Sequence, residues 1–372
     1  KHSSGVDILD GLRLIASDGP AKASSEIRKL ASGLARFRDP NPRRSSVEIF
    51  ITAVPLIALW IMMWESLQLG YWLCLLLAVP AAGFLVRLFM IQHDCSHGAL
   101  FRSRKINDWI GRIIGVFTLT PYDHWRQTHA EHHAGTGNLD RRGIGDVYTM
   151  TVREYLNESR FRQLMYRLYR HPLTLFGIGP AYLFLFQHRV PSGMMHKGWH
   201  PWLTTMATNA AIISLGGLFI WLIGVNAFVA IHLPVVILAA SVGVWLFYVQ
   251  HQFEDTYWKE AGEWTHAQAS LTGSSFYDLP APLRWLTANI GVHHVHHLNS
   301  RIPFYRLSEV MRAHPELGSV GRMTVADSLA CVRLALWDEH QNRLISFREL
   351  VDREQIEPSC PSPAATENGK MT

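Results

Sequence analysis

Four long apolar stretches constrain the fold of this chain more than any other feature. They cover residues 49–67, 71–91, 203–224 and 228–250, and each approaches the roughly 20 residues that a helix needs to cross a bilayer core. Short segments join the first to the second and the third to the fourth. Only 17% of the 372 residues are charged, fewer than the roughly one quarter typical of soluble domains. We therefore expect an all-α integral membrane protein with two transmembrane helical hairpins.

The distribution of basic residues predicts the orientation of these hairpins. Of the 35 lysines and arginines, only Arg87 lies within the four stretches, and we expect its long side chain to reach the membrane surface. The connecting segments 65–70 and 224–227 contain no lysine or arginine, so the remaining basic residues lie on the opposite side, which the positive-inside rule assigns to the cytoplasm. Both termini are then cytoplasmic, as in a protein of the bacterial inner membrane. The net charge of +5 suits anionic lipid headgroups and requires no nucleic acid partner.

The apolar stretches divide the chain into six parts. We expect a cytoplasmic N-terminal segment (1–48), a first hairpin (49–92), a cytoplasmic cap (93–202), a second hairpin (203–250), further cap (251–356) and a disordered tail (357–372). The N-terminal segment shows no signal-peptide pattern. The four cysteines are scattered along the chain and do not form a disulfide framework, which fits a reducing compartment.

Three short windows contain an unusual concentration of histidine. They read 93-HDCSH-97, 129-HAEHH-133 and 293-HHVHH-297. Residues that are three or four positions apart lie on one face of a helix, so each window can present its histidines together. A single His-rich turn is often only a solvated surface feature, but three windows with matched helical spacing indicate a metal site.

The windows can meet only if they lie on one side of the membrane. Two further apolar runs lie between the windows: 109–122 follows the first window and 173–186 follows the second. If either run crossed the bilayer alone, it would put the windows on its two sides across the membrane from each other. At 14 residues each they are shorter than a membrane span requires, so we expect both to lie in the membrane interface. All three windows then face the cytoplasm.

The number of histidines favours two metal ions. Neighbours such as His132 and His133 diverge by about 100° on a helix, so one turn can serve two ions. The eight candidate ligands within the windows exceed the four that a single zinc takes. Imidazole also binds copper, iron and nickel, so ligand type alone does not identify the metal. The eight candidates are His93, His97, His129, His132, His133, His293, His296 and His297.

His251 is a ninth candidate ligand, because it follows the fourth apolar stretch just as the first window follows the second stretch. The alternative is that His251 is a lone interfacial histidine. Four other histidines, His124, His188, His200 and His266, are weaker candidates.

Polar residues beside the proposed ligands could orient them. A histidine bound to a metal usually donates its other ring N–H to a carboxylate or carbonyl. Asp94, Glu131, Glu254 and Asp255 are placed for this role, and Asn289 lies one helical turn before His293. The alternative is that these residues are ordinary solvated groups.

The windows, alternating with two hairpins, resemble the membrane fatty acid desaturases. The surrounding stretches 137–155, 250–258 and 273–307 are also similar, in particular to the bacterial acyl-lipid enzymes of the omega-6 (delta-12) and delta-5 type, and the likeness covers about residues 40–310. The resemblance implies a non-haem di-iron centre that uses O₂ and two electrons to insert a double bond into a long acyl chain. The eight window histidines match the ligand motifs of the family, and His294 matches a variable position.

The resemblance also implies partners. The substrate would be a long-chain acyl lipid or acyl thioester, and no catalytic residue is expected beyond the metal ligands. The chain contains no GxGxxG fingerprint, and 314-HPELG-318 is a poor match to a haem-binding HPGG. Electrons should therefore come from a separate donor of the ferredoxin or cytochrome b5 type. A di-iron hydroxylase or oxygenase of lipids or carotenoids is an alternative, and a non-enzymatic membrane metal-binding protein is another.

Overall fold

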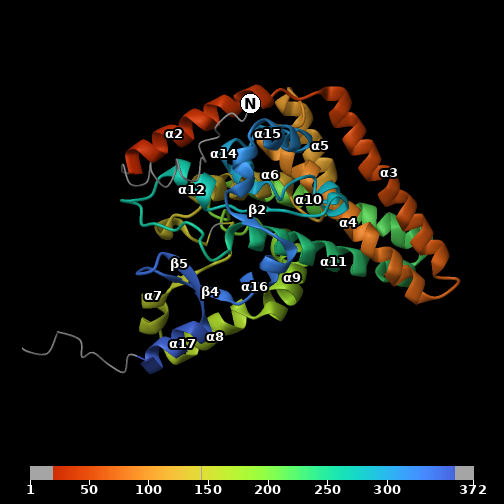
Figure 1. The fold of residues 1–372 in the computed structure, drawn as a ribbon. Coiled ribbons are helices and arrows are strands. Elements are labelled where there is room, and N and C mark those ends of the chain that lie inside the picture. Colours follow the sequence, from red (N-terminus) through yellow and green to blue (C-terminus); the bar gives the residue numbers. More distant parts are fainter. Residues whose placement is uncertain (1–19, 144, 357–372) are drawn as a thin grey trace, which may run out of the picture.

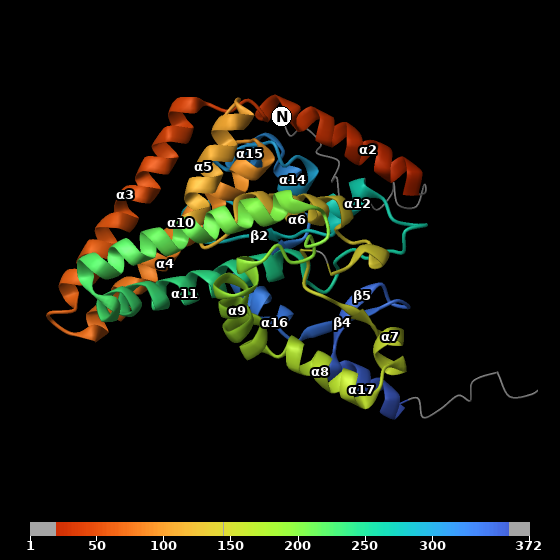
Figure 2. The same cartoon turned by 180° about the vertical axis from the view of Figure 1, so that it is seen from behind.

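The structure is a computed structural model that describes residues 20–143 and 145–356. The tail 357–372 that we expected to be irregular lies outside these residues. Four long helices dominate the fold: α3 (Pro42–Ser66), α4 (Tyr71–His97), α10 (Trp199–Ile223) and α11 (Val225–His251). In Figures 1 and 2 they form two hairpins that converge at one end of the molecule. These four are long and apolar enough to cross a membrane, which confirms the predicted spans.

The hairpin helices extend beyond the apolar stretches into the cap. Asn41 caps the first turn of α3 by accepting a hydrogen bond from the Arg44 backbone N–H, and Pro42 occupies the first helical position. At the other end of the hairpin, α4 continues through His97 and stops at Gly98, which adopts the left-handed conformation that favours glycine. The first histidine window is therefore the last turn of a spanning helix and does not belong to a separate cap element.

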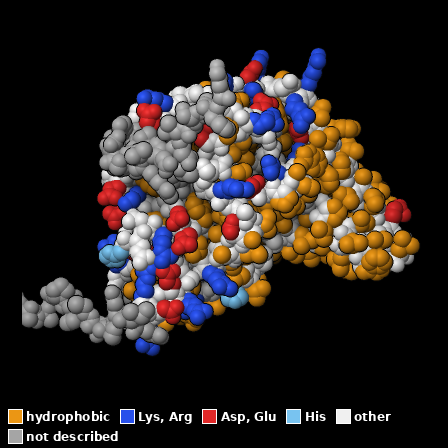
Figure 3. Space-filling view, in the orientation of Figure 1, with side chains coloured by type: hydrophobic (Ala, Val, Ile, Leu, Met, Phe, Trp, Pro, Cys, Tyr) orange, Lys and Arg blue, Asp and Glu red, His pale blue; other side chains and the backbone are white. Residues whose placement is uncertain are grey.

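The surface of the hairpins is apolar, whereas charged side chains gather on the rest of the molecule (Figure 3). Large side chains such as Trp72, Ile213 and Trp221 are exposed on these helices. An apolar surface of this extent is typical of contact with lipid.

Arg87 does not reach the membrane surface, and the prediction that it would was wrong. Its side chain is buried between α3 and α4, where the guanidinium pairs with Glu48 and donates from Nε to the Thr52 hydroxyl at 3.1 Å. The guanidinium also lies over the ring of Trp285, at 4.0 Å from Arg87 Cζ. The carboxylate of Glu48 neutralises the charge of Arg87 inside the protein. Glu48 is the seventh residue of α3 and precedes the apolar stretch 49–67, so the sequence did not indicate it as a partner.

The two shorter apolar runs do not form long helices. Residues 109–122 cover most of α5 (Arg104–Phe117) and the turn into α6 (Tyr122–Gly135), and residues 173–186 form the short π-helix η3 (Thr174–Ile178) and α9 (Gly179–Leu185). Neither run is among the helices that could cross a membrane. Helices α5 and α6 approach so closely at Gly111 that a side chain there would collide with the ring of Tyr122.

Two small sheets accompany the helices and were not predicted. One has the strand order β1–β4–β5, formed by Met150–Thr151, Leu334–Asp338 and Arg343–Ser346, and the other pairs β2 (Phe276–Tyr277) with β3 (Arg322–Met323). In the larger sheet, β1 and β4 are parallel, and β4 and β5 are antiparallel. A separate buried cluster that includes Tyr155 and Tyr166 packs against this sheet.

The remaining elements complete the cap around the ends of α4 and α11. They are α2 (Pro20–Gly33), η1 (Leu34–Phe37), η2 (Leu139–Arg141), α7 (Val152–Asn157), α8 (Arg160–Arg170), η4 (Gln187–Arg189), α12 (His266–Thr272), α13 (Ala281–Leu286), α14 (His293–Leu298), η5 (Phe304–Arg306), α15 (Leu307–Ala313), η6 (Pro315–Ser319), α16 (Val325–Cys331) and α17 (Phe347–Ile356).

Candidate metal centre

All nine predicted ligand histidines come together where four helices meet. Two stand on the last turns of α4, three on α6, one at the end of α11 and three on α14. They separate into two groups, and within each group the potential ligand atoms lie within 4.8 Å of one another. The first group contains His93, His97, His129, His133 and His296, and the second contains His132, His251, His293 and His297.

Helical spacing explains how the second and third windows are divided between the two groups. On α6, His129 and His133 are four residues apart and face the first group, whereas His132 points to the second. The third window divides in the same manner. His293 and His297 are four residues apart and face the second group, whereas His296 faces the first.

The ring nitrogens of neighbouring ligands are evenly spaced. The Nε2–Nε2 distances are 3.0 Å for His97–His129, 3.1 Å for His129–His133, 3.1 Å for His133–His296, 3.1 Å for His132–His251, 3.0 Å for His251–His293 and 3.1 Å for His293–His297. Two nitrogens that are each about 2.1 Å from one ion lie about 3.0 Å apart at a right angle and about 3.4 Å apart at the tetrahedral angle. The spacing is therefore close enough for neighbouring rings in each group to bind one ion.

The histidines of the cap helices are held in the neutral form that binds metals. Burial lowers the pKa of His129, His133 and His296 well below the ordinary value of a histidine, and the charges of neighbouring histidines lower it further. The same causes lower the pKa of His293 and His297. When neutral imidazole rings direct their nitrogen lone pairs at one another, the lone pairs repel unless a cation lies between them. The donor set thus fits two metal ions.

Three groups outside the two sets of histidines lie against Nδ1 atoms of these rings. Asp146 accepts a hydrogen bond from His132 Nδ1 at 2.5 Å, and the Gly273 carbonyl accepts one from His251 Nδ1 at 3.0 Å. Among the residues that the sequence suggested, Asp94 lies beside the ligands. One of its carboxylate oxygens is 3.4 Å from His93 Nδ1, and the other accepts the Phe304 backbone N–H at 2.7 Å.

Sequence reasoning missed Asp146 and Gly273. Asp146 follows an irregular segment with no helical or strand period, and Gly273 contributes only its backbone. Their single signal in the sequence is that both lie in stretches that resemble the desaturases, 137–155 and 273–307.

Four of the suggested orienting residues do not contact a ligand ring. Glu254 is exposed and pairs with Arg343, and Asp255 is also exposed. Both follow the end of α11, where the chain turns to the surface. Asn289 donates to the Phe304 carbonyl and accepts from Ser308, and Glu131 pairs with Lys197. Proximity in the sequence did not place these groups against the ligands.

The other histidines lie outside both groups. His294 is buried and donates from Nε2 to the Leu317 carbonyl at 3.0 Å, on the side of α14 away from the ligands. His124 and His188 line the large cavity that is described below, whereas His200 is exposed and His266 contacts Ser270.

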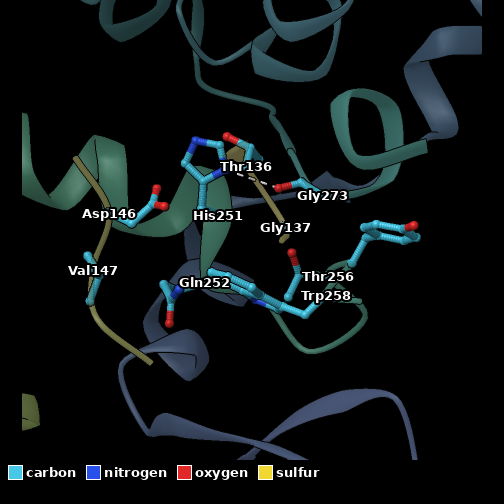
Figure 4. Close-up of a pocket in the computed structure, with 10 residues that line it drawn as sticks. Thr136, Gly137, Asp146, Val147, His251, Gln252, Thr256, Trp258 and Gly273 are labelled. Atoms are coloured by element: carbon cyan, nitrogen blue, oxygen red, sulfur yellow. Dashed lines mark hydrogen bonds between the residues drawn. The ribbon is translucent and has the colours of Figure 1, made fainter. Parts of the chain in front are cut away.

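A cavity of about 10 Å³, close to the size of one water molecule, lies behind the second group. Figure 4 shows Asp146 and Gly273 on either side of His251, with Gln252, Thr256 and Trp258 beneath them. The hydrogen bond from His251 to Gly273 is drawn there as a dashed line. The polar groups that hold the second set of ligands thus come from several segments far apart in the sequence.

A second cavity, of about 1030 Å³, opens beside the two groups. His93, His129 and His293 form part of its wall, and most of the exposed lining is apolar. The apolar wall comes from α4, α11 and the segment made by η3 and α9. On α11 the lining includes Val236, Ala239, Ala240 and Gly243. Since these residues lie in a spanning helix, the cavity extends from the histidines toward the middle of the membrane.

Comparisons of the sequence with known proteins point to one family. Residues 66–322, which are well over half of the chain, match the family described as "Fatty acid desaturase". A Bacillus subtilis protein named "Fatty acid desaturase" is 40% identical over 345 residues, which cover 92% of this chain and 96% of that protein.

More distant relatives have names that specify their substrates. A Synechocystis "sn-1 acyl-lipid omega-3 desaturase (ferredoxin)" is 29% identical over 252 residues, which are 63% of this chain and 66% of that protein. An Arthrospira platensis "sn-1 oleoyl-lipid 12-desaturase" is 24% identical over 275 residues, which are 68% of this chain and 72% of that protein.

Proposed function

Since the chain belongs to the fatty acid desaturase family, we propose that its two histidine groups hold two irons and that its large cavity holds the acyl chain to be oxidised. The observation that carries this proposal is the position of three ligand histidines in the wall of a long apolar cavity. A hydrocarbon chain in this cavity would lie beside both groups of histidines.

Iron would supply the step that side chains cannot perform. An unactivated C–H bond offers no acidic proton, so its oxidation needs a cofactor, and two irons with O₂ as co-substrate would provide that oxidation. Removal of two hydrogens from the acyl chain, together with two electrons and two protons from outside, reduces O₂ to two molecules of water. The histidines hold the metals, while Asp146 and the Gly273 carbonyl fix the orientation of His132 and His251.

The cavity would bind and orient the substrate. An acyl chain that enters from the bilayer gains little from the hydrophobic effect, so close packing against the cavity wall would hold it in one register. A fixed register places one pair of carbons beside the histidines. The cavity wall formed by α4 and α11 belongs to the spanning helices, so we propose that the acyl chain of a membrane lipid enters from the bilayer.

The electrons would come from a separate protein of the ferredoxin or cytochrome b5 type. One relative is named as a ferredoxin-dependent enzyme. His97 and His133 are partly exposed, whereas the four histidines of the second group are buried. We propose that the donor approaches the side of the molecule where these two rings reach the surface.

We further propose that the histidine groups and both termini face the cytoplasm of a bacterial cell. The hairpin turns contain no lysine or arginine, which supports this orientation. Single cysteines at positions 67 and 226 should react with an impermeant thiol reagent only from outside intact cells. Cysteines at positions 105 and 200 should react only after lysis, and external labelling at either of these two positions would refute the orientation.

The proposed activity can be tested in a host that lacks unsaturated lipids. Expression of the full chain should produce unsaturated acyl chains, and mass spectrometry would locate the double bond. A hydroxylated product would support the hydroxylase alternative. Bound metal without any oxidised lipid, when a reduced donor is present, would support the non-enzymatic alternative.

A further inference from the structure

Helix α8 presents an apolar face to the outside of the molecule. Its exposed side chains include Phe161, Leu164, Met165 and Leu168, which are 71%, 52%, 45% and 49% accessible. The four positions are spaced i, i+3, i+4 and i+7, so they form one stripe along the helix.

The opposite face of α8 is polar and buried. Tyr166 and Arg170 are each 4% accessible. Arg170 donates to the Leu334 carbonyl at 2.8 Å and to the Gln252 side chain at 2.9 Å, and Tyr166 donates to the Ala335 carbonyl. A helix on the surface of a soluble protein has the reverse arrangement. These hydrogen bonds hold α8 with its apolar stripe facing outward.

Arginines flank the stripe on both sides. At about 100° per residue, the four apolar side chains span an arc of about 100°. Arg160 and Arg167 lie just beyond one edge of this arc, and Arg162 lies beyond the other. Arg162 pairs with Glu158, and Arg167 donates from Nε to the Tyr155 hydroxyl, whereas Arg160 has no ion-pair partner within residues 20–143 and 145–356. An apolar stripe between arginines is typical of a helix that lies in the headgroup region of a membrane.

The segment that follows α8, which we expected to lie in the interface, also exposes apolar side chains. Leu173, Ile178, Tyr182 and Phe186 are exposed along η3 and α9. In Figures 1 and 2, α9 and α8 lie end to end along one edge of the molecule, with α9 near α11 and α8 near α17. Since η3 and α9 also form a wall of the large cavity, the outer surface of this wall adjoins α8.

We propose that α8 is a bilayer-binding surface that inserts Phe161, Leu164, Met165 and Leu168 among lipid chains and places its arginines on anionic phosphates. A soluble protein partner would fit the apolar stripe, but it would not explain the exposed apolar side chains of α9 or the arginines at both edges. The larger sheet is thereby tied to the membrane, because Tyr166 belongs to the cluster that packs against it. This inference is independent of the chemistry at the metal centre.

The insertion of α8 can be measured in the full chain reconstituted into nanodiscs. Cysteine replaces Leu164 in a Cys360→Ser background and carries an environment-sensitive fluorophore, while the native Cys74, Cys95 and Cys331 are buried. The matched control carries the same label at Arg348, an exposed position on the neighbouring helix α17. We expect spin-labelled lipid to quench the label at position 164 and a water-soluble quencher to reach the label at position 348.

A second comparison tests the role of charge. The fraction of quenching by lipid at position 164 should rise when phosphatidylglycerol replaces part of the phosphatidylcholine. In the Arg160→Gln/Arg162→Gln variant this rise should be lost. In anionic nanodiscs, each arginine that is removed should lower the ratio of inserted to non-inserted α8 about fivefold. Arg348→Gln should leave the rise unchanged.

Three outcomes would overturn the proposal. If aqueous quencher reaches position 164 as readily as position 348, α8 does not contact the bilayer. If neither quencher reaches position 164, protein covers the stripe. If the lipid quenching is the same in neutral and anionic nanodiscs, the arginines do not bind headgroups.

Discussion

The substitution Gly243→Phe should close the acyl cavity without damaging the protein. Gly243 lines the cavity, and a side chain added there meets no atom within 4 Å. It lies eight residues before His251 on α11, which is about 12 Å along the helix toward the middle of the membrane. A phenyl ring at this position would therefore occupy space that we assign to the distal part of the acyl chain.

The expected loss can be worked out from the space that the ring takes. A phenyl ring displaces on the order of four methylenes, and for an acyl substrate that is presented from water each of these contributes about 0.8 kcal/mol when it is buried. The transition state for a long chain then loses about 3 kcal/mol, which lowers kcat/KM by more than about a hundredfold. The free energy of unfolding should not fall, because glycine is the least favourable residue in a helix interior apart from proline.

The assay compares desaturation of acyl chains of several lengths by purified variants, with thermal unfolding and iron content measured in parallel. Gly243→Ala adds one carbon and should cost less than about fivefold in kcat/KM. Gly217→Phe is the matched control, because Gly217 is an exposed residue of α10 that also has no atom within 4 Å of an added side chain. Chains too short to reach Gly243 should be affected least.

Two results would refute this reasoning. If Gly243→Phe retains the kcat/KM of the unchanged protein for long chains, the acyl chain does not occupy this cavity. If Gly217→Phe loses as much activity as Gly243→Phe, the effect comes from a bulky residue in a spanning helix and not from the cavity.

Other substitutions test the assignment of individual side chains. His296→Gln should abolish activity and lower iron content, whereas His294→Gln should retain measurable desaturation and near-normal iron, because His294 faces away from both groups; equal loss in both variants would contradict the assignment. Asp146→Asn keeps an acceptor for His132 but removes its charge, so iron retention against a chelator should fall about 10- to 100-fold; unchanged retention would show that the carboxylate does not support the site. Burial raises the pKa of Asp338, but hydrogen bonds from Arg353 and from two backbone N–H groups outweigh it and hold this pKa below its usual range. The stability that Asp338 contributes is therefore complete above about pH 4 and is lost as pH falls through the folded pKa. Hydrogen exchange should show the sheet around β4 opening in acid, with a weaker pH dependence in Asp338→Asn; an identical dependence in both proteins would exclude this ion pair as the cause.

The sequence predicted the spanning helices and the ligand set for physical reasons that act locally. A bilayer requires a minimum apolar length, and this length is visible in the sequence without knowledge of the fold. Histidines at positions i, i+3 and i+4 share a helix face wherever the helix lies, so the windows on α4, α6 and α14 could be recognised. His251 could be proposed because it ends a spanning helix in the same way as the first window.

Features that depend on contacts between distant segments could not be predicted. Helical spacing divides His296 from His293 and His297, but which histidines of α4, α6 and α11 join each of them follows from how these helices meet in space, which no periodicity encodes. Asp146 reaches His132 from an irregular segment, and the partner of Arg87 is a glutamate on another helix. The strands of the two sheets have two to five residues each, too few to show an alternating pattern.

The metal content of the full chain tests the central claim most directly. The structure offers two groups of histidines, one of five potential ligands and one of four, and within each group the ring nitrogens lie close enough to share one ion. Metal analysis of protein purified from membranes of cells grown with sufficient iron should find about two irons per chain, and no zinc at full occupancy. One zinc per chain and no iron would contradict the assignment of these histidines to a di-iron centre.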